Sequence, residues 1–196
     1  NFPGNEAKIR QAVGETQGII LLYKGEIIDP LYHASCGGEK TEDMVNVWGK
    51  KLPYLQSVNC SGHEDKHENV KAVFSLAEVD EKLGTSLHAL PASAFKGKDL
   101  QQSCQIVDTS KAGRVMDMTV TGQHFTGAEI RSKLNLPSAI FDIKLDEEQL
   151  EITSQGYGHG VGMCQYGAAD MAAQGAGYQK ILLHYYKGVQ LAKVAA

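Results

Sequence analysis

The sequence predicts an α+β fold in which β-hairpins are mixed with short helices and a pair of helices closes the chain. Three observations support this class. Short apolar runs rich in β-branched residues alternate with turn residues, capping boxes mark two helix starts, and no regular strand–helix–strand repeat is present. A length of 196 residues with 42% hydrophobic and 21% charged residues suits a globular domain with a sizeable core. We therefore expect residues 1–196 to form one domain.

Local patterns assign the expected elements. Apolar residues four apart predict a helix, and apolar β-rich runs broken by Lys-Gly or Thr-Gly predict hairpins. Ser or Thr followed three residues later by Glu predicts a capped helix start, and Gly predicts a helix end. In chain order we expect a helix over residues 6–13, a hairpin over 19–32, a strand over 72–75, a helix over 75–84, a strand over 115–120, a helix over 126–134, a hairpin over 139–153, and helices over 161–174 and 178–186.

Charge and hydropathy exclude two classes of partner. The net charge is −4 and the basic residues are scattered, so nothing indicates nucleic-acid binding, whereas a neutral polymer remains a suitable ligand. No apolar run approaches the length of a membrane-spanning helix, and the first residues lack the apolar core of a signal peptide. If the protein is exported, we expect the export or anchoring segment to lie outside this sequence.

The segment "GYGHGVGMCQYGA", which begins at Gly156, places glycines around polar and aromatic side chains directly before an expected helix. It has neither the spacing of a dinucleotide-binding fingerprint nor the Gly-Lys-Ser/Thr end of a P-loop. We expect the glycines to clear space around His159, Gln165 and Tyr166. Such a set suits a sugar polymer, because sugars offer hydroxyl groups and an apolar ring face. The structural alternative is that Tyr166 belongs to the core and His159 is a hydrogen-bonded buried histidine.

Two Cys/His pairs indicate a metal site. His33 and Cys36 form one pair, Cys60 and His63 form the other, and together they offer the nitrogen and sulfur ligands of a tetrahedral zinc site. His67 competes with His63 as a ligand. One alternative is a Cys36–Cys60 disulfide, which would stabilise the fold by about 3 kcal/mol. The other is a set of free thiols.

The remaining cysteines and a run of acids carry weaker signals. Cys104 and Cys164 are expected to behave as small buried apolar residues. Glu39, Glu42 and Asp43 are typical of a solvated surface. Their functional alternative is one carboxyl group whose pKa is raised in a sugar-filled cleft.

Three segments, residues 7–58, 113–136 and 156–189, together resemble the SpoIID/LytB family. This family comprises the stage II sporulation protein D lytic transglycosylases and their amidase-enhancer relatives. The resemblance covers nearly the whole chain in the family order. Its specific parts are "YHASCGG" at 32–38, the first signature, and "GHGVGMCQYGA" at 158–168, the second signature.

The resemblance implies a protein that acts outside the cytoplasm, membrane-anchored or secreted, on the glycan strands of peptidoglycan. Family enzymes cut the bond between N-acetylmuramic acid and N-acetylglucosamine without water and leave a 1,6-anhydro sugar. One carboxylic acid serves first as acid and then as base. These enzymes prefer strands whose peptides an amidase has removed, as happens during engulfment in sporulation. A cell-wall amidase and other engulfment proteins are the implied protein partners.

The resemblance also assigns site residues. The family's catalytic glutamate corresponds to a position upstream of Asn1, so no catalytic residue is assigned in this chain. Some clostridial members carry zinc, which supports a metal site at Cys36, and other members use the matching cysteine in a disulfide. The residues that match the two signatures, and that are expected to position substrate, are His33, Ser35, His159, Gln165 and Tyr166.

Two further hypotheses follow. The protein could be a non-catalytic amidase enhancer that binds glycan and an amidase, in which case it binds strands without cutting them. It could also be a metal-dependent hydrolase that uses His33, Cys36 and a metal-bound water. In that case chelation abolishes activity while leaving the fold intact.

Overall fold

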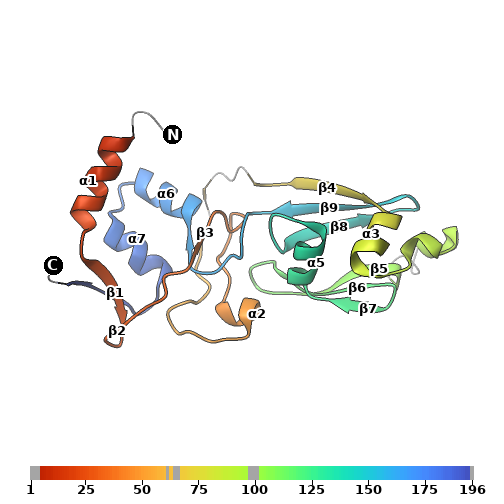
Figure 1. Ribbon diagram of the computed structural model, residues 1–196, viewed down its shortest axis with the longest axis horizontal. Coiled ribbons are helices and arrows are strands. Elements are labelled where there is room, and N and C mark those ends of the chain that lie inside the picture. Colours follow the sequence, from red (N-terminus) through yellow and green to blue (C-terminus); the bar gives the residue numbers. More distant parts are fainter. Residues whose placement is uncertain (1–4, 61, 64–66, 97–101, 195–196) are drawn as a thin grey trace.

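The computed structural model describes residues 5–60, 62–63, 67–96 and 102–194. Figure 1 shows two lobes arranged end to end. The terminal lobe contains residues 5–60, 62–63 and 156–194, and the middle lobe contains residues 67–96 and 102–155. Each lobe has its own cluster of buried apolar side chains. The expected α+β class is confirmed, because helices and small sheets are mixed in both lobes.

The terminal lobe combines short strands with helices from both ends of the chain. Its core contains buried side chains from β1, α7 and the loops between them, among them Leu21, Tyr54 and Tyr185. Its elements are α1 (Glu6–Thr16), β1 (Ile19–Tyr23), β2 (Glu26–Ile27), β3 (Tyr32–His33), α2 (Met44–Trp48), β10 (Met163–Cys164), α6 (Gln165–Ala173), α7 (Tyr178–Tyr185) and β11 (Gln190–Lys193).

One sheet of this lobe joins the two ends of the chain, in the order β11-β1-β2 with antiparallel pairs. The turn between β1 and β2 is Lys24-Gly25, with φ of 53° and 87°, the left-handed pair that a tight hairpin needs. The helix before it, α1, buries none of its residues, and its apolar side chains Ile9 and Val13 are exposed.

A second pairing in this lobe brings the two signatures together. β3 and β10 are parallel, with Tyr32 opposite Met163 and His33 opposite Cys164. The backbones approach so closely that a Cβ on Gly162 would collide with the carbonyl of Leu31. Gly162 also has a φ of 73°, a conformation that favours glycine. Its lack of a side chain therefore permits the contact between the signatures.

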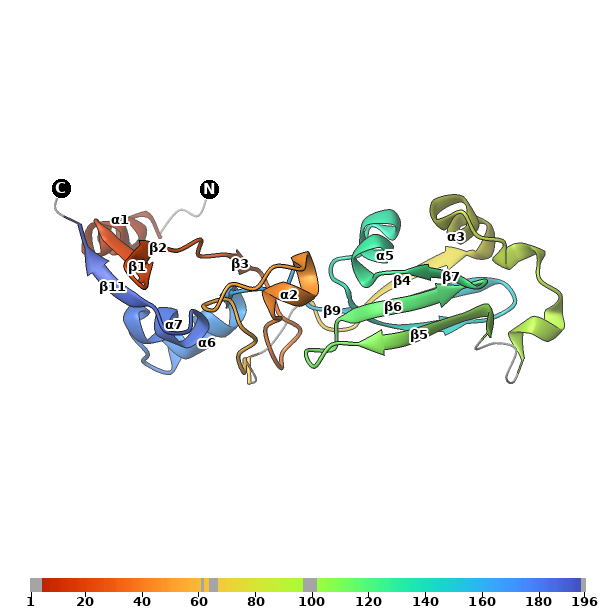
Figure 2. The same ribbon diagram turned by 90° about the horizontal axis from the view of Figure 1, so that it is seen from below.

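The middle lobe contains two three-stranded sheets, β4-β9-β8 and β5-β6-β7, in which every pair is antiparallel. Leu76, Val79 and Ile130 pack the helices that begin at Leu76 and Gly127 into the core that the sheets enclose. Figure 2 shows α3 and α5 on the same side of this lobe. Its elements are β4 (Val70–Ser75), α3 (Leu76–Leu83), η1 (Leu87–Ala89), η2 (Ala92–Phe95), β5 (Cys104–Thr109), β6 (Val115–Val120), β7 (Gln123–Phe125), α5 (Gly127–Leu134), β8 (Ile140–Leu145) and β9 (Gln149–Gln155).

A buried carboxylate links the lobes. Glu42 of the terminal lobe is only 3% exposed, and its Oε2 accepts a hydrogen bond of 2.5 Å from the hydroxyl of Ser110 in the β5–β6 turn. Its Oε1 accepts from the backbone of Asp43 and the side chain of Asn46, each at 2.8 Å. The expectation that Glu42 belongs to a solvated acidic run is therefore corrected, since both of its oxygens are used inside the protein.

Three expectations about elements also change. The hairpin that begins at Ile19 returns only as far as Ile27, because the next strand, β3, pairs with β10 instead. The penultimate helix begins at Gln165, not at residue 161, because residues 163–164 form β10. β11 was not expected, and it forms by pairing with β1. None of the helices in the described part of the chain combines the length and apolar character that a membrane crossing requires.

Candidate functional site

The two signatures meet at one place on the surface, near the junction of the lobes. The rings of His33 and His159 have centroids 5.7 Å apart. Ser35 and Tyr157 exchange backbone hydrogen bonds of 3.1 and 2.9 Å, which continues the contact beyond β3 and β10. Two segments far apart in the sequence therefore present their side chains to a common site.

His33 is buried and its orientation is set by the backbone. Its Nδ1 lies 3.1 Å from the carbonyl oxygen of Val161, which can only accept, so Nδ1 carries the proton. Its Nε2 is buried and has no hydrogen-bond partner among the described residues. Because Nδ1 carries the proton, Nε2 of His33 is an acceptor that can receive a hydrogen bond from a neighbouring donor.

His159 is half-buried between His33 and an aromatic ring. The indole of Trp48 lies with its centroid 5.1 Å from that of His159, and Trp48 is 45% exposed. The backbone N–H of Val161 donates to His159 Nδ1 at 3.1 Å. Burial lowers the pKa of His159, and the neighbouring His33 lowers it further. The imidazole of His159 is thus held neutral beside a partly exposed aromatic face.

The other signature residues take different places. Ser35 is buried, and its hydroxyl accepts from the backbone N–H of Gly37 at 3.2 Å, so it shapes the turn of the first signature. Gln165 is exposed at the start of α6. Tyr166 is half-buried, with its ring centroid 6.3 Å from that of His63 and 5.9 Å from that of His67.

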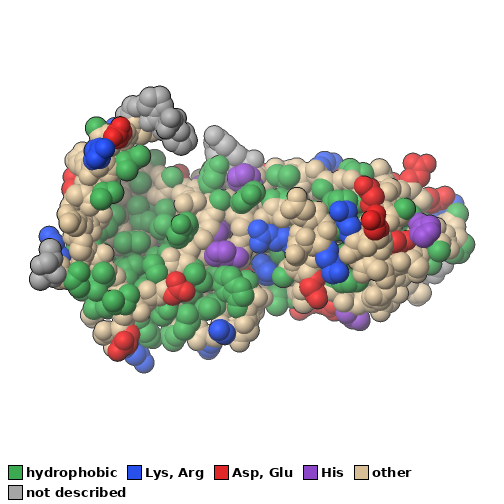
Figure 3. All heavy atoms as spheres, in the orientation of Figure 1, with side chains coloured by type: hydrophobic (Ala, Val, Ile, Leu, Met, Phe, Trp, Pro, Cys, Tyr) green, Lys and Arg blue, Asp and Glu red, His purple; other side chains and the backbone are tan. Residues whose placement is uncertain are grey.

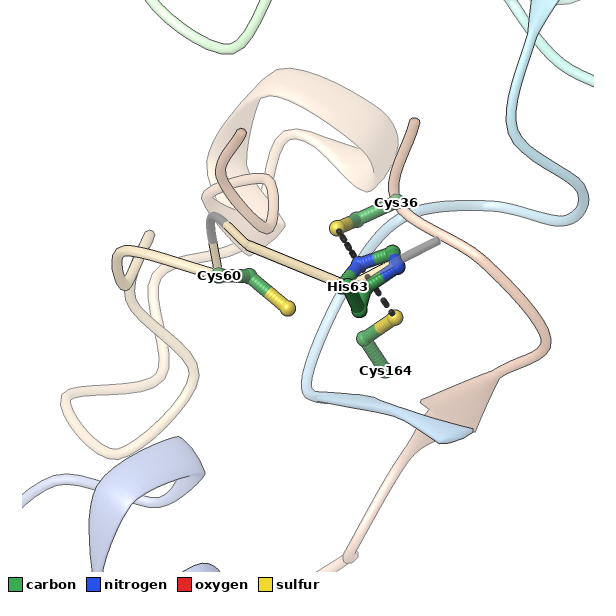
Figure 4. A group of neighbouring side chains, drawn as sticks. All are labelled: Cys36, Cys60, His63 and Cys164. Atoms are coloured by element: carbon green, nitrogen blue, oxygen red, sulfur yellow. Dashed lines mark hydrogen bonds between the residues drawn. The ribbon is translucent and has the colours of Figure 1, made fainter. Parts of the chain in front are cut away.

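Beside this site lies a buried group of three cysteines and one histidine, Cys36, Cys60, His63 and Cys164 (Figure 4). Their potential ligand atoms all lie within 4.8 Å of one another. His63 Nε2 lies 3.5 Å from Cys36 Sγ and 3.7 Å from Cys164 Sγ. Side chains with one nitrogen and three sulfur ligands, all pointing to one centre, can bind a metal ion.

The three cysteines influence one another's ionisation. The neighbouring Cys36 and Cys60 lower the pKa of Cys164. The interaction with Cys164 raises the pKa of Cys36 and raises that of Cys60 to about 12. The backbone N–H of Gly167, in the first turn of α6, also donates to Cys164 Sγ at 3.4 Å. A cysteine whose pKa is lowered favours a bound cation, because metals bind the deprotonated form.

The position beside the metal-binding group that Gly167 occupies has no room for a side chain. A Cβ on Gly167 would collide with Cys60 Sγ and with the hydroxyl of Tyr185. That hydroxyl lies 3.1 Å from Cys60 Sγ. The other ring nitrogen of His63, Nδ1, is buried without a hydrogen-bond partner in the described part of the chain.

An open groove runs between the lobes next to the group. It has a volume of about 690 Å³, and Cys36 and His63 form part of its wall. Glu39, Glu68 and Asp142 also line it, and its volume is within the usual range of small-molecule sites.

Comparison with known proteins shows what the chain is related to. It is 36% identical to stage II sporulation protein D of Bacillus subtilis (strain 168) over 191 residues, which is 96% of this chain. The chain is homologous to stage II sporulation protein D. The stage II sporulation protein D of Bacillus amyloliquefaciens is also 36% identical, over 98% of the chain. The resemblance to the SpoIID/LytB family is thereby confirmed.

The same homology extends to a second kind of relative. The amidase enhancer of Bacillus subtilis (strain 168) is 26% identical over 228 residues, covering 92% of this chain. The chain spans about half of the two stage II sporulation proteins D, 52% and 53% of their lengths, and 32% of the amidase enhancer. No family model matches the sequence.

In this SpoIID homologue the structure corrects the expected ligand set at one position. Cys164 completes the group with Cys36, Cys60 and His63, and His33 lies outside it with its Nδ1 on a carbonyl. Cys164 was expected to be only a small buried residue. The parallel pairing of β3 with β10 places it opposite His33, and sequence spacing carries no signal for that register.

The structure also tests the expectations about the disulfide, Cys104 and His67. The disulfide alternative is wrong for this structure, because Cys36 and Cys60 are both free thiols. Cys104 is a buried free thiol in the core of the middle lobe, as expected. His67 is not part of the group, and its ring packs against those of Tyr157 and Tyr166.

Proposed function

We propose that this protein is a peptidoglycan lytic transglycosylase that acts outside the cytoplasmic membrane during sporulation engulfment. Its substrate would be glycan strands whose peptides have been removed, and its products would carry 1,6-anhydro ends. The observation that carries the proposal is the meeting of His33 and His159 beside Trp48, built from both signatures of a SpoIID homologue.

The site has the chemistry that a sugar ring needs. A partly exposed indole offers a flat apolar face to the C–H groups of a pyranose, and the half-buried imidazole beside it offers polar contacts to hydroxyl groups. Trp48 and His159 supply these two features 5.1 Å apart. The groove beside Cys36 and His63 offers a further surface along which more sugars of a strand would lie.

The residues of this chain would bind and orient the strand. The reaction needs one carboxyl group that protonates the leaving oxygen and then, as carboxylate, removes the proton of the attacking C6 hydroxyl. Glu42 is unsuited to that role, because Ser110 and Asn46 already occupy its oxygens. The family resemblance assigns the acid to a position upstream of Asn1, and no residue of this chain is proposed in its place.

We also propose zinc as the metal of the Cys36–Cys60–His63–Cys164 group. One histidine nitrogen and three cysteine sulfurs within 4.8 Å of one another would hold this ion, and they are the donor types that zinc prefers. Four protein ligands fill a tetrahedral zinc and leave no position for a reactive water. This favours a structural ion that ties the first signature and the start of α6 to the loop of Cys60, and it disfavours the metal-dependent hydrolase.

The decisive experiment incubates the full-length protein with peptide-free glycan strands and analyses the products by mass spectrometry. Products with 1,6-anhydro ends support the transglycosylase, and their absence with active, full-length protein rejects it.

The second candidate is an amidase enhancer, which the homology to the Bacillus subtilis amidase enhancer favours. It predicts binding of the same strands without cleavage, together with faster turnover by a cell-wall amidase. Measuring strand products and amidase rates in the same reaction separates the two candidates.

A further inference from the structure

A basic pocket adjoins the site on the side of the middle lobe. It has a volume of about 330 Å³, and its wall consists of Arg114, Ala128, Arg131, Ser132, Asn135 and Leu136. Figure 3 shows Lys and Arg side chains next to histidines on this face, near the junction of the lobes. All of these pocket residues lie in the segment 113–136 that resembles the family, but none belongs to the two signatures, and the proposed sugar site assigns them no role.

Arg114 connects this pocket to the sugar site. Its side chain also lines the small cleft that contains His159 and Ser35, and its Nη1 donates to the carbonyl oxygen of His159 at 3.5 Å. Only 5% of Arg114 is exposed. Burial lowers the pKa of Arg114, and the positive charge of Arg131 lowers it further. The negative charge of Glu42 raises it and partly offsets these effects. Arg114 thus joins the pocket to the backbone of His159, the residue whose imidazole we place against the glycan.

Arg131 supplies the second guanidinium of the pocket. It lies on α5, and its Nε donates to the carbonyl of Leu136 at 3.4 Å. No carboxylate among the described residues lies within ion-pairing distance of Arg131. Ser132 and Asn135 add a hydroxyl and an amide to the same wall. A guanidinium has donors for a bidentate carboxylate, and two repelling guanidinium groups favour an anion between them.

Building on the proposed function, we propose that Arg114 and Arg131 bind the carboxylate of the lactyl group on a muramic acid residue of the strand. That carboxylate is free only when the stem peptide has been removed, because a peptide turns it into a neutral amide. N-acetylglucosamine has no such group at all. The pocket would therefore make the protein select peptide-free strands and set the register of the two sugars beside His159. The overall charge of −4 works against binding an anionic polymer, so such a preference must come from a local site.

The test compares binding of the full-length protein to three strands of equal length by calorimetry. The first is peptide-free, the second is the same strand with its carboxyl groups chemically amidated, and the third carries stem peptides. We expect about tenfold tighter binding to the first strand than to the second. A hydrogen-bonded pair between a guanidinium and a carboxylate contributes a difference of about this size. Arg131→Gln should remove this difference, whereas Lys133→Gln, which removes a charge from the same helix outside the pocket, should keep it.

Salt provides a second readout that needs no variant. Rising ionic strength should weaken binding of the peptide-free strand and leave the amidated strand almost unaffected. Equal binding of the first two strands, or an Arg131→Gln effect of the same size on both, would overturn the inference while leaving the proposed function intact. A preference for the peptide-bearing strand that depends on Arg131 would also overturn it, since the anion would then belong to the peptide. Binding of no strand would overturn the proposed function itself.

Discussion

The imidazole rings of His33 and His159 lie at 58° to each other with their centroids 5.7 Å apart, although one belongs to the first signature and the other to the second. The parallel pairing of β3 and β10 produces this relationship. It sets His33 opposite Cys164, and His159 lies in the glycine-rich loop directly before β10. The same pairing places Cys164 beside Cys36. The sugar site and the metal-binding group therefore share one backbone arrangement.

Replacing His159 by alanine should weaken glycan binding more than it weakens the fold. We expect about a tenfold loss of affinity for peptide-free strands and a loss of about 1 kcal/mol in the free energy of unfolding, the latter because the N–H of Val161 loses its acceptor. Calorimetry and urea denaturation measure the two quantities. His124→Ala, at an exposed position in the middle lobe, is the matched control. A large fall in thermal midpoint with unchanged binding would show that His159 is structural.

Trp48 should contribute to binding through its exposed face. Trp48→Ala is expected to reduce strand affinity between about threefold and tenfold, since an aromatic contact provides about 0.5–1.5 kcal/mol beyond its buried area. Trp48→Phe should retain much of the affinity. Val45→Ala, on the same short helix and similarly exposed, should change neither binding nor stability appreciably. Equal affinity of Trp48→Ala and wild type, measured by calorimetry, would remove Trp48 from the site.

The metal proposal predicts a selective loss of zinc. Elemental analysis of purified Cys60→Ser should show much less zinc than wild type, because one of four ligands is removed. Its thermal midpoint should fall as well, since structural zinc stabilises the folded state. Cys104→Ser removes another buried thiol in the other lobe and should keep the wild-type zinc content. Wild-type protein without zinc, or Cys60→Ser with undiminished zinc, contradicts the assignment.

A pair of glycine substitutions tests the packing of the metal-binding group. Gly167→Ala forces a Cβ into Cys60 Sγ and the hydroxyl of Tyr185, so it should cost about 1–3 kcal/mol and reduce zinc retention. Gly14→Ala, in α1, meets no atom within 4 Å and should stabilise the protein by about 0.5–1 kcal/mol. Denaturation curves and zinc analysis of both variants provide the comparison. A Gly167→Ala protein as stable and zinc-loaded as wild type would contradict the close packing of Gly167 against these two side chains.

The lowered pKa of His159 predicts a pH dependence of stability. Burial and the neighbouring His33 keep the folded pKa below the ordinary value of 6.5. As the pH falls below 6.5, the unfolded chain takes up a proton before the folded one does, so the unfolded state is favoured. The stabilising contribution of neutral His159 is therefore present above pH 6.5 and is lost as the pH falls through the folded pKa.

The measurement compares wild type with His159→Gln between pH 7.5 and pH 5, a range of about two units around the ordinary histidine value. Wild type should lose free energy of unfolding relative to the variant as the solution becomes more acidic. An NMR titration of the His159 ring should give its pKa directly. A value at or above 6.5 would refute the predicted direction.

Elements with local signals were predicted well. The capping boxes Ser75–Glu78 and Thr126–Glu129 are both present, with reciprocal side-chain and backbone hydrogen bonds. The turn at Lys24-Gly25 is where it was expected. Each of these features depends on residues within one turn of one another, so a short stretch of sequence contains all the information that it needs.

Features that depend on contacts distant in the chain were missed. β11 forms because β1 offers it a partner, and residues 163–164 extend instead of starting a helix because β3 lies beside them. Glu42 was expected at a solvated surface, but it is buried and accepts a hydrogen bond from Ser110 of the other lobe. The position of Cys164 in the metal-binding group follows from the same kind of contact.

The amino-acid sequence by itself determined the α+β class, the helices and strands that have local signals, the two signatures and the relationship to stage II sporulation protein D, because these depend on residue type and short spacing. Only the tertiary structure decided which cysteine completes the metal-binding group, that Trp48 lies against His159, and that Arg114 and Arg131 share a pocket. Those juxtapositions depend on strand register and on how the lobes pack, and both are set by the summed contacts of many residues, which no short stretch of the chain encodes.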